Sequence, residues 1–354
     1  MDKYAEFEKT RALPDYARDA MRRILQCRTE ALGGHAWVCK QCNNTKVAYN
    51  SCLNRSCPQC GWIGMDKWIL RTVPKVMDYD HFHLIFTIPE ELNQIWIKNT
   101  KLMIQLLFKA VWATLAEFSR THLDAQLGCM MNLHTWSRTM NLHPHIHCLV
   151  TAGGYNKKGR WVDAGEYLFP VLAMSPWFRA RYLTSIRENA EKLGGIDFVN
   201  KIIRPLFEKN WNIFTTKKYS HGRGVIRYLA NYIKGGPIKN SRIISYNGHS
   251  VTIRYKDHKD QKWKTMTLTA NEFIRRFVMH LVPKRLRTLR FAGFYAGKKH
   301  RLTKLPKIAN HIDQRFLGNR EEFCRQCGIP MDFHPNLTRK TIKKFIPPPL
   351  RIAA

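Results

Sequence analysis

The chain has 354 residues, 44% of them hydrophobic, which is enough for two or three domains with packed cores. Its 59 Lys and Arg against 26 Asp and Glu give a formal net charge of +33, which favours a polyanionic partner and above all nucleic acid. The sequence shows neither an apolar run long enough to span a bilayer nor a signal-peptide core, so we expect a cytoplasmic protein without a membrane partner.

The hydrophobic pattern of the N-terminal half predicts helices and strands in alternation. In chain order, the expected elements are a helix over residues 1–26, a cysteine-rich stretch over 27–62, a strand over 81–89, a long amphipathic helix over 90–122, and two strands over 128–140 and 143–154. Pro89 ends the first strand, and Gly153-Gly154 close the last one.

The C-terminal half is richer in helix and in basic residues. Its expected elements are a mainly helical segment over 172–218, a helix over 223–237 ended by Gly235-Gly236-Pro237, a hairpin over 241–257 that turns at Asn247-Gly248, a helix at about 270–281, and a basic tail. The order strand, helix, strand, strand, helix predicts an α+β fold in which an antiparallel sheet carries helices on one face. The expected regions are a cysteine-rich domain over 1–75, a central domain over 76–240, a basic hairpin-helix part over 241–320, and a tail over 321–354.

Six of the ten cysteines fall between residues 27 and 60, and such clustering favours metal binding over packing. Two CxxC pairs, Cys39-Cys42 and Cys57-Cys60, have 14 residues between them. Because each pair presents two thiolates to one point, we expect these four cysteines to bind one tetrahedral structural zinc ion. A closed set of four ligands leaves no open position, which predicts a role in folding and nucleic-acid docking.

The remaining candidate ligands leave alternatives open. Cys27, His35 and Cys52 either hold a second zinc ion with a fourth ligand or are simply buried side chains. Cys324-Cys327 is a lone pair that His311 or His334 would complete, and we expect a minor or vestigial site there. Basic residues near the first cysteines are expected to contact phosphates; they are Lys40, Lys46, Arg55 and Lys67.

The stretch "NLHPHIHCLV" places three histidines within five positions at the start of an apolar strand. Residues two apart share a face of a strand, so His145 and His147 point the same way, while Ile146 and Cys148 point into the helix-covered side. Pro144 cannot donate to a sheet ladder and is expected to mark the strand's start. Two imidazoles on one face bind a divalent ion if a third protein atom helps. Taken alone, such a pair is more often two partly exposed strand histidines without a functional role.

A second pattern supplies a nucleophile. Tyr228 and Tyr232 are four residues apart and therefore share one face of the helix in "RYLANYIKGG". Taken alone, the pair would preferably be interpreted as an aromatic core stripe, but the polar neighbours Arg227, Asn231 and Lys234 favour a site that contacts DNA. A tyrosine facing a metal-bearing sheet suits cleavage of a phosphodiester, with the DNA 5′ end joined to the phenol and a free 3′-hydroxyl as the other product.

These motifs occur in one order with "CRTEALGGHAWVCKQCNN", "YNSCLNRSCPQC", "FHLIFTIPEEL" and "MTLTANEFIRRFVMHLVPKRLRTLRFAGF". Together, over roughly residues 20–330, the chain resembles the two-tyrosine HUH transposases of the insertion-sequence 91 family. The resemblance implies that His145 and His147 bind a catalytic Mg²⁺ or Mn²⁺ ion, and that Tyr228 and Tyr232 are the nucleophiles. It also implies a Zn²⁺-binding N-terminal region, and rolling-circle-like movement through single-stranded, hairpin-bearing DNA ends into a target DNA.

The chain departs from that family at two places. Ser56 stands where related sequences commonly have His, so a possible ligand of the second zinc ion is missing there. Ser137-Arg138 stand where they often have Gly-Gln, so an amide ligand is missing there. The third ligand of the catalytic ion is therefore open, and the candidates are His83, His134, His143 and Asn231.

Two other functions are compatible with part of the pattern. A plasmid rolling-circle replication initiator or relaxase shares the histidine and tyrosine motifs, but the cysteine cluster and "NEFIRRF" favour the transposase. A non-catalytic zinc-containing DNA-binding regulator explains the charge and the cysteines, but leaves the histidine strand and the tyrosine pair as coincidence. Covalent capture of single-stranded DNA separates the regulator from the two enzymes.

Overall fold

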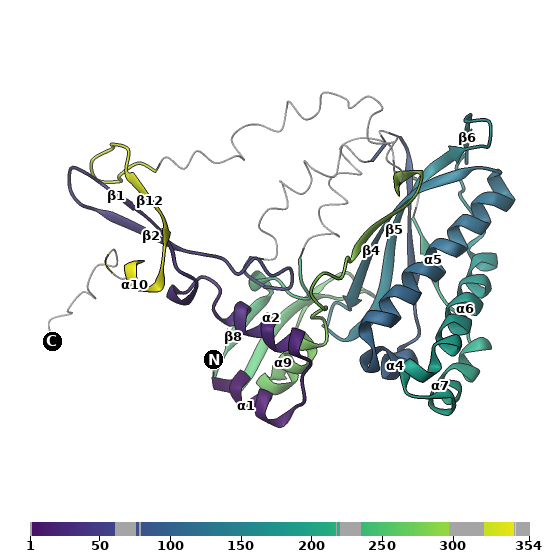
Figure 1. The fold of residues 1–354 in the computed structure, drawn as a ribbon, viewed down its shortest axis with the longest axis horizontal. Coiled ribbons are helices and arrows are strands. Elements are labelled where there is room, and N and C mark those ends of the chain that lie inside the picture. The colour runs from purple at the N-terminus through teal and green to yellow at the C-terminus, as the bar shows by residue number, and fades with distance from the viewer. Residues whose placement is uncertain are drawn as a thin grey trace.

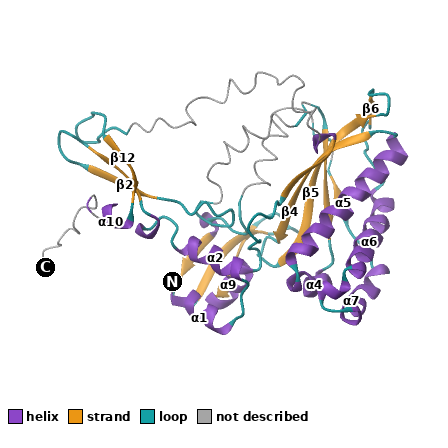
Figure 2. Ribbon diagram, viewed as in Figure 1, coloured by secondary structure: helices purple, strands orange, loops and turns teal. Residues whose placement is uncertain are grey.

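The computed structural model describes residues 2–60, 76–77, 79–216, 218–219, 235–296, 322–342 and 344 (Figures 1 and 2). Within these ranges the chain forms three antiparallel sheets with helices packed on them, so the predicted α+β class is confirmed. The expected tyrosine helix over 223–237 lies outside the described residues except for its last three.

The largest sheet has the strand order β11-β4-β5-β3-β7, and β6 pairs with β5. Its strands are β3 (His81–Thr87), β4 (Gln126–Trp136), β5 (Leu142–Tyr155), β6 (Trp161–Asp163), β7 (Ile213–Thr215) and β11 (Leu289–Gly293). The expected strands over 81–89, 128–140 and 143–154 are therefore present. β5 runs past Gly153-Gly154 and bonds with β6, so the two glycines do not close the strand as predicted.

Helices cover one face of this sheet, as Figure 1 shows for α5 and α6. They are α4 (Asn93–Lys98), α5 (Thr100–Leu123), α6 (Val171–Glu188) and α7 (Ile196–Ile203). Alternate strand residues such as Leu84, Ile146 and Cys148 are buried against them in the main core. The predicted direction of Ile146 and Cys148 is thereby confirmed, because strand side chains alternate between faces.

The predicted single helix over 90–122 is divided at Asn99. The side chain of Asn99 accepts a hydrogen bond from the backbone N–H of Leu102, at 3.1 Å, and so caps the start of α5. By length and composition α5 would also suit a membrane span, although 61% of its most apolar window is buried inside the protein. Packing between the sheet and α6 accounts for that composition.

A second layer joins the N-terminal helices to a later sheet. Its elements are α1 (Asp2–Thr10), α2 (Asp15–Leu25), β8 (Ile243–Tyr246), β9 (Ser250–Lys256), β10 (Trp263–Thr269) and α9 (Ala270–Val278). Phe7 and Met21 share a core with Ile253 and Phe277. The predicted hairpin at 241–257 is correct, but it belongs to a three-stranded sheet whose third strand, β10, the sequence analysis did not predict.

The third sheet unites residues from both ends of the chain (Figure 1). It consists of β12 (Asp332–Leu337), β1 (Gly34–Val38) and β2 (Thr45–Tyr49), in that order, and α10 (Arg339–Ile342) packs beside it. We call these three strands the terminal sheet. Its pairings, and those of β11 with β4, cross the region boundaries expected at residues 75, 240 and 320.

Candidate catalytic and metal sites

Four histidines gather on the sheet face that points away from the helices. The antiparallel register places His145 opposite His134, His147 opposite Asn132, and His83 opposite Leu149. Residues directly opposite one another share a face, as do residues two apart, so all four imidazoles lie on one side. We call this side, with His83, His134, His145 and His147, the histidine face.

Three of these imidazoles have the arrangement of a metal site. The ligand atoms of His134, His145 and His147 all lie within 4.8 Å of one another. His145 and His147 were predicted as a pair, and His134 was one of four candidates for the third ligand. His134 comes from the neighbouring strand β4, so only the register of β4 on β5 brings it to the pair.

Each of these rings makes a contact through one nitrogen that sets its orientation. His145 Nδ1 is 2.7 Å from the backbone oxygen of His143, to which it donates. His147 Nδ1 is 2.9 Å from His83 Nε2, and the two rings stack in parallel planes. The amide Nδ2 of Asn132 donates to His134 Nε2 at 2.9 Å.

Burial also sets the charge of the histidine face. Removal from water lowers the pKa of His83 to about 4 and the pKa of His145 to about 3. It lowers the pKa of His147 as well, and the neighbouring His134 adds to the effect. His83, His145 and His147 are therefore neutral at neutral pH, which is the form that binds metal ions.

Of the other three candidates for the third ligand, two have a different role and one lies outside the described residues. His83 contacts His147 and supports that ring from β3. His143 supplies the backbone oxygen that holds His145. Asn231 lies outside the described residues.

Pro144 does not start the strand, as was expected, but sits two residues inside β5. Pairing with β3 ends at His145, and the ladder with β4 is irregular between His134 and Trp136, so Pro144 needs no ladder partner there.

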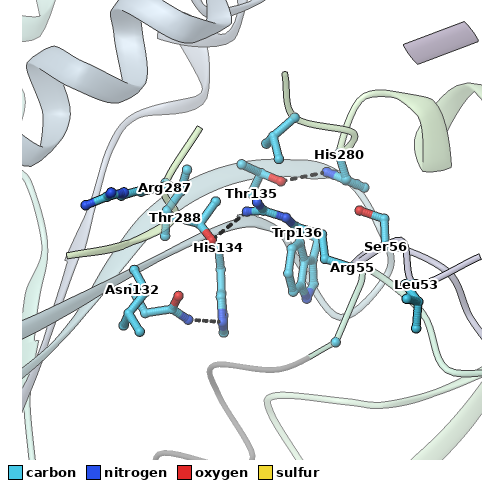
Figure 3. Close-up of a pocket in the computed structure, with 14 residues that line it drawn as sticks. Leu53, Arg55, Ser56, Asn132, His134, Thr135, Trp136, His280, Arg287 and Thr288 are labelled. Atoms are coloured by element: carbon cyan, nitrogen blue, oxygen red, sulfur yellow. Dashed lines mark hydrogen bonds between the residues drawn. The ribbon is translucent and has the colours of Figure 1, made fainter. Parts of the chain in front are cut away.

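A pocket of about 440 Å³ opens beside His134 (Figure 3). It is lined by Leu53, Arg55, Ser56, Asn132, Leu133, His134, Thr135, Trp136, Gly235, His280, Val282, Arg287, Thr288 and Leu289. These residues come from four separate parts of the chain. The sequence analysis missed His280, whose ring bonds with Thr135 Oγ1 at 3.2 Å and with the backbone oxygen of Met140 at 3.0 Å, and so fixes the end of β4.

The predicted nucleophiles Tyr228 and Tyr232, and the predicted DNA contacts Arg227 and Lys234, lie outside the described residues. The described residues on either side of them both adjoin the site. Tyr219 bonds through its backbone to His81 on β3, and Gly235 lines the pocket beside His134.

The structure groups the cysteines differently from the prediction. Cys39 and Cys42 do not meet Cys57 and Cys60; one cluster is Cys27, Cys52, Cys57 and Cys60, and the other is Cys39, Cys42, Cys324 and Cys327. The reason is the β1–β2 hairpin, whose five-residue strands are each roughly 17 Å long. Its turn carries Cys39 and Cys42 away from its base, where Cys27 and Cys52 lie. We call the two sets the base cluster and the tip cluster.

The base cluster has the dimensions of a tetrahedral thiolate site. The sulfur of Cys60 is 3.7 Å from that of Cys27 and 3.3 Å from that of Cys52. A Zn–S bond of about 2.3 Å implies sulfur–sulfur edges of about 3.8 Å. Burial raises the pKa of Cys57 to about 11, so its thiolate needs a compensating cation.

Three other predicted residues have defined partners. His35 is not a cysteine-cluster ligand; its ring packs edge-on against Trp37 and Phe333. Lys40 forms an exposed ion pair with Asp332 at 3.1 Å. Arg55 donates to Thr288 Oγ1 at 2.8 Å and to the backbone oxygen of Leu286 at 3.1 Å (Figure 3). Arg55 thus ties the base-cluster segment to the wall of the pocket.

Comparison with known proteins agrees with this arrangement. A family model described as "Transposase zinc-binding domain" matches residues 1–88, and one described as "Putative transposase" matches residues 128–302. The first range contains the base cluster, and the second contains most of β4 and all of β5, with His134, His145 and His147.

Two relatives cover most of the chain. A protein of Sinorhizobium fredii (strain NBRC 101917 / NGR234) named "Putative transposase y4qJ" is 32% identical over 305 residues, 81% of this chain and 76% of its own. The "Transposase for insertion sequence element IS801" of Pseudomonas savastanoi pv. phaseolicola is 30% identical over 297 residues, 81% of this chain and 72% of its own. These matches confirm the resemblance seen in the motifs. The chain therefore belongs to the transposases of the insertion-sequence 91 family and carries their zinc-binding domain within residues 1–88.

Proposed function

We propose that this transposase cuts and rejoins single-stranded DNA at the ends of its element through 5′-phosphotyrosine intermediates. The observation that carries the proposal is the convergence of His134, His145 and His147 on the histidine face. A face on which three imidazoles converge, each held through a ring nitrogen, is built for a ligand rather than for packing. The substrate of the transposase is cellular DNA, and we therefore propose that the protein acts in the cytoplasm.

The donor set fits a divalent ion. His134, His145 and His147 would hold Mg²⁺ or Mn²⁺, with open positions left for phosphate oxygens. When bound, the ion would withdraw charge from the scissile phosphate. Asn132 and His83 orient the rings of His134 and His147.

Tyr228 and Tyr232 are the proposed nucleophiles. A phenol oxygen attacks the phosphorus, the bond from phosphorus to the 3′ oxygen breaks, and the phenol proton ends on the solvent or on the departing 3′-hydroxyl. The phosphotyrosine ester keeps the energy of the broken bond, so rejoining needs no ATP. The positions of Tyr219, whose backbone bonds to His81 on β3, and of Gly235 in the pocket support this assignment, because these two residues flank the tyrosine segment in the sequence.

The pocket beside His134 suits the DNA strand that leads to the cut. Trp136 offers an aromatic face, stacked 4.8 Å from the ring of His134, and Arg287 adds a positive charge on the same wall. Base stacking on an aromatic ring and a cation on the backbone are the usual means of holding single-stranded DNA. We propose hairpin-bearing element ends and a target strand as the partners.

Covalent capture tests the proposal. Purified protein is mixed with a labelled single strand of the element end and Mn²⁺, denatured, and resolved on a gel. The parent should leave a protein–DNA adduct and a free 3′-hydroxyl fragment, whereas His134→Ala, His145→Ala and His147→Ala should leave neither. His143→Ala should be milder, since its backbone oxygen rather than its ring holds His145.

His122→Ala is the matched control, because His122 lies at the end of α5, stacked on Phe118 in the helical layer. It should cleave like the parent. Full cleavage by the purified His145 or His147 variant, with either metal, would rule out the assigned site.

A further inference from the structure

The terminal sheet brings the C-terminal segment onto the first hairpin of the chain. β12 pairs with β1 in antiparallel register, with Ala36 opposite His334 and Val38 opposite Asp332. The contact is close: Gly33 has a φ of +66°, and a Cβ added there would lie 2.2 Å from the backbone oxygen of Leu337. Only glycine fits at this position, so the local sequence of the hairpin is suited to the arriving strand.

At the end of this sheet, two turns with the same backbone pattern face each other. In the first, the N–H of Cys39 bonds to the oxygen of Asn44, and the N–H of Asn43 bonds to the oxygen of Cys39. In the second, the N–H of Cys324 bonds to the oxygen of Ile329, and the N–H of Gly328 bonds to the oxygen of Cys324. Both turns carry cysteines at the first and fourth positions.

The match extends to the backbone angles. The fifth residue of each turn is left-handed, with φ of 55° at Asn43 and 69° at Gly328. Each turn is thus a knuckle that presents two sulfurs to one side. The backbone amide of Cys327 points at the sulfur of Cys324 and lowers the pKa of that thiol to about 6.

The sulfurs of the tip cluster meet at the spacing of a tetrahedral site. The four ligand atoms lie within 4.8 Å of one another, and Cys42 Sγ is 3.6 Å from Cys324 Sγ. Sulfur–sulfur edges of a zinc tetrathiolate are about 3.8 Å. Both Cys39 and Cys324 are buried.

Apart from the β12–β1 ladder and the ring of Phe333, the described part of the C-terminal segment buries few side chains. In its described part, residues 322–342, the buried apolar side chains are Cys324 and Ile342. Its ion pairs to the N-terminal hairpin, such as Lys46 with Glu322 at 2.7 Å, are exposed, and exposed pairs each contribute at most about 1 kcal/mol. Short segments with so small a core usually depend on a metal ion for their order.

We propose that Cys39, Cys42, Cys324 and Cys327 bind a second structural zinc ion, which clasps the C-terminal segment to the N-terminal hairpin. Its ligands come half from the N-terminal and half from the C-terminal region, and Cys324 and Cys327 lie outside both matched family ranges. All four positions are filled by protein, so the site is structural. It is separate from the base cluster and independent of the cleavage chemistry.

The zinc content of the full-length protein tests whether the tip cluster binds a second zinc ion. Protein purified without chelator should contain two zinc ions per chain, and the Cys324→Ser/Cys327→Ser double variant should contain one. Cys129→Ser is the matched control, because Cys129 is buried in β4 beside the main core, and it should retain two. A double variant that still holds two zinc ions would overturn the proposal.

Alkylation gives a second test, in which the main measurement is made on the parent protein. Iodoacetamide followed by mass spectrometry should leave all four tip cysteines unmodified until a chelator is added, and then modify them together. Cys27→Ser should lose the base zinc ion while the tip cysteines stay protected. Immediate alkylation of Cys324 and Cys327 in the zinc-loaded parent would contradict a zinc ion in the tip cluster.

Discussion

His83 and His147 lie on adjacent strands with their rings parallel, and His83 Nε2 is 2.9 Å from His147 Nδ1. The contact helps to fix the orientation of His147, whose ring lies beside His134 and His145. His83 itself is not in the group of three that could hold a metal ion. It is therefore a positioning residue.

This role predicts different effects for the two histidines. His83→Ala should lower the apparent affinity for Mn²⁺ in the cleavage reaction by about 10- to 100-fold, as is usual when a support of a metal ligand is lost. Cleavage at saturating Mn²⁺ should return close to the parental rate. His147→Ala should not cleave at any Mn²⁺ concentration. Cleavage rates measured across a Mn²⁺ titration decide this, and an unchanged midpoint for His83→Ala would contradict it.

The two tyrosines are expected to act in alternation. Tyr228→Phe and Tyr232→Phe remove only a phenol oxygen and keep the ring, so the free energy of unfolding should barely change. Each single variant should still nick an oligonucleotide but fail to complete transposition, and the double variant should form no adduct. Gel-based adduct assays and a transposition assay provide the measurements.

Tyr219→Phe is the control for the tyrosines, since the backbone rather than the phenol of Tyr219 bonds to His81. It should transpose like the parent. Normal transposition by either single variant, or an adduct mapped by mass spectrometry to Tyr219, would disprove the two-nucleophile mechanism.

Arg55 is expected to stabilise the junction between the base-cluster segment and the pocket wall. Arg55→Ala removes the bonds to Thr288 and Leu286, which should lower the free energy of unfolding by about 1–2 kcal/mol. Arg55→Lys should not restore it, because an ammonium cannot reproduce the two-pronged guanidinium contact. Lys40→Ala, which breaks an exposed ion pair, should cost less than about 0.5 kcal/mol. Urea unfolding curves measure all three, and an Arg55→Ala variant as stable as Lys40→Ala would refute the role.

Binding of single-stranded DNA should weaken steeply with salt, given the net charge of +33. If roughly 6–10 phosphates are contacted, affinity should fall by about 10³ to 10⁵ between 50 and 200 mM salt. Arg287→Ala should reduce the slope of log affinity against log salt by about 1. Arg120→Ala, on the helical side and paired with Glu117, should leave the slope unchanged. A flat salt response in fluorescence anisotropy titrations would contradict the assigned surface.

The base cluster leads to a prediction that does not follow from the spacing of the cysteines in the sequence. Cys27→Ser should lower the zinc content by one ion per chain, because Cys27 Sγ is a member of the cluster. His35→Ala should leave the zinc content unchanged, because its ring packs on Trp37 and Phe333. An unchanged zinc content in Cys27→Ser would contradict the base cluster.

The sequence alone determined the features that depend on one continuous segment. Strand geometry places residues two apart on one face, so the shared direction of His145 and His147 and the opposite direction of Ile146 and Cys148 followed from spacing. The α+β class and the family followed in the same way, because each motif is short and local and their order lies in the chain itself.

Only the tertiary structure decided which distant segments meet. His134 joins His145 because β4 pairs with β5 in one particular register, whereas spacing left His83, His143 and Asn231 equally open. Cys39 and Cys42 meet Cys324 and Cys327 because β12 pairs with β1, and the length of the hairpin keeps them from Cys57 and Cys60. A CxxC pair shows that two thiolates converge, but its partner pair depends on strand pairing across most of the chain, and that pairing is set by long-range packing and sheet hydrogen bonds.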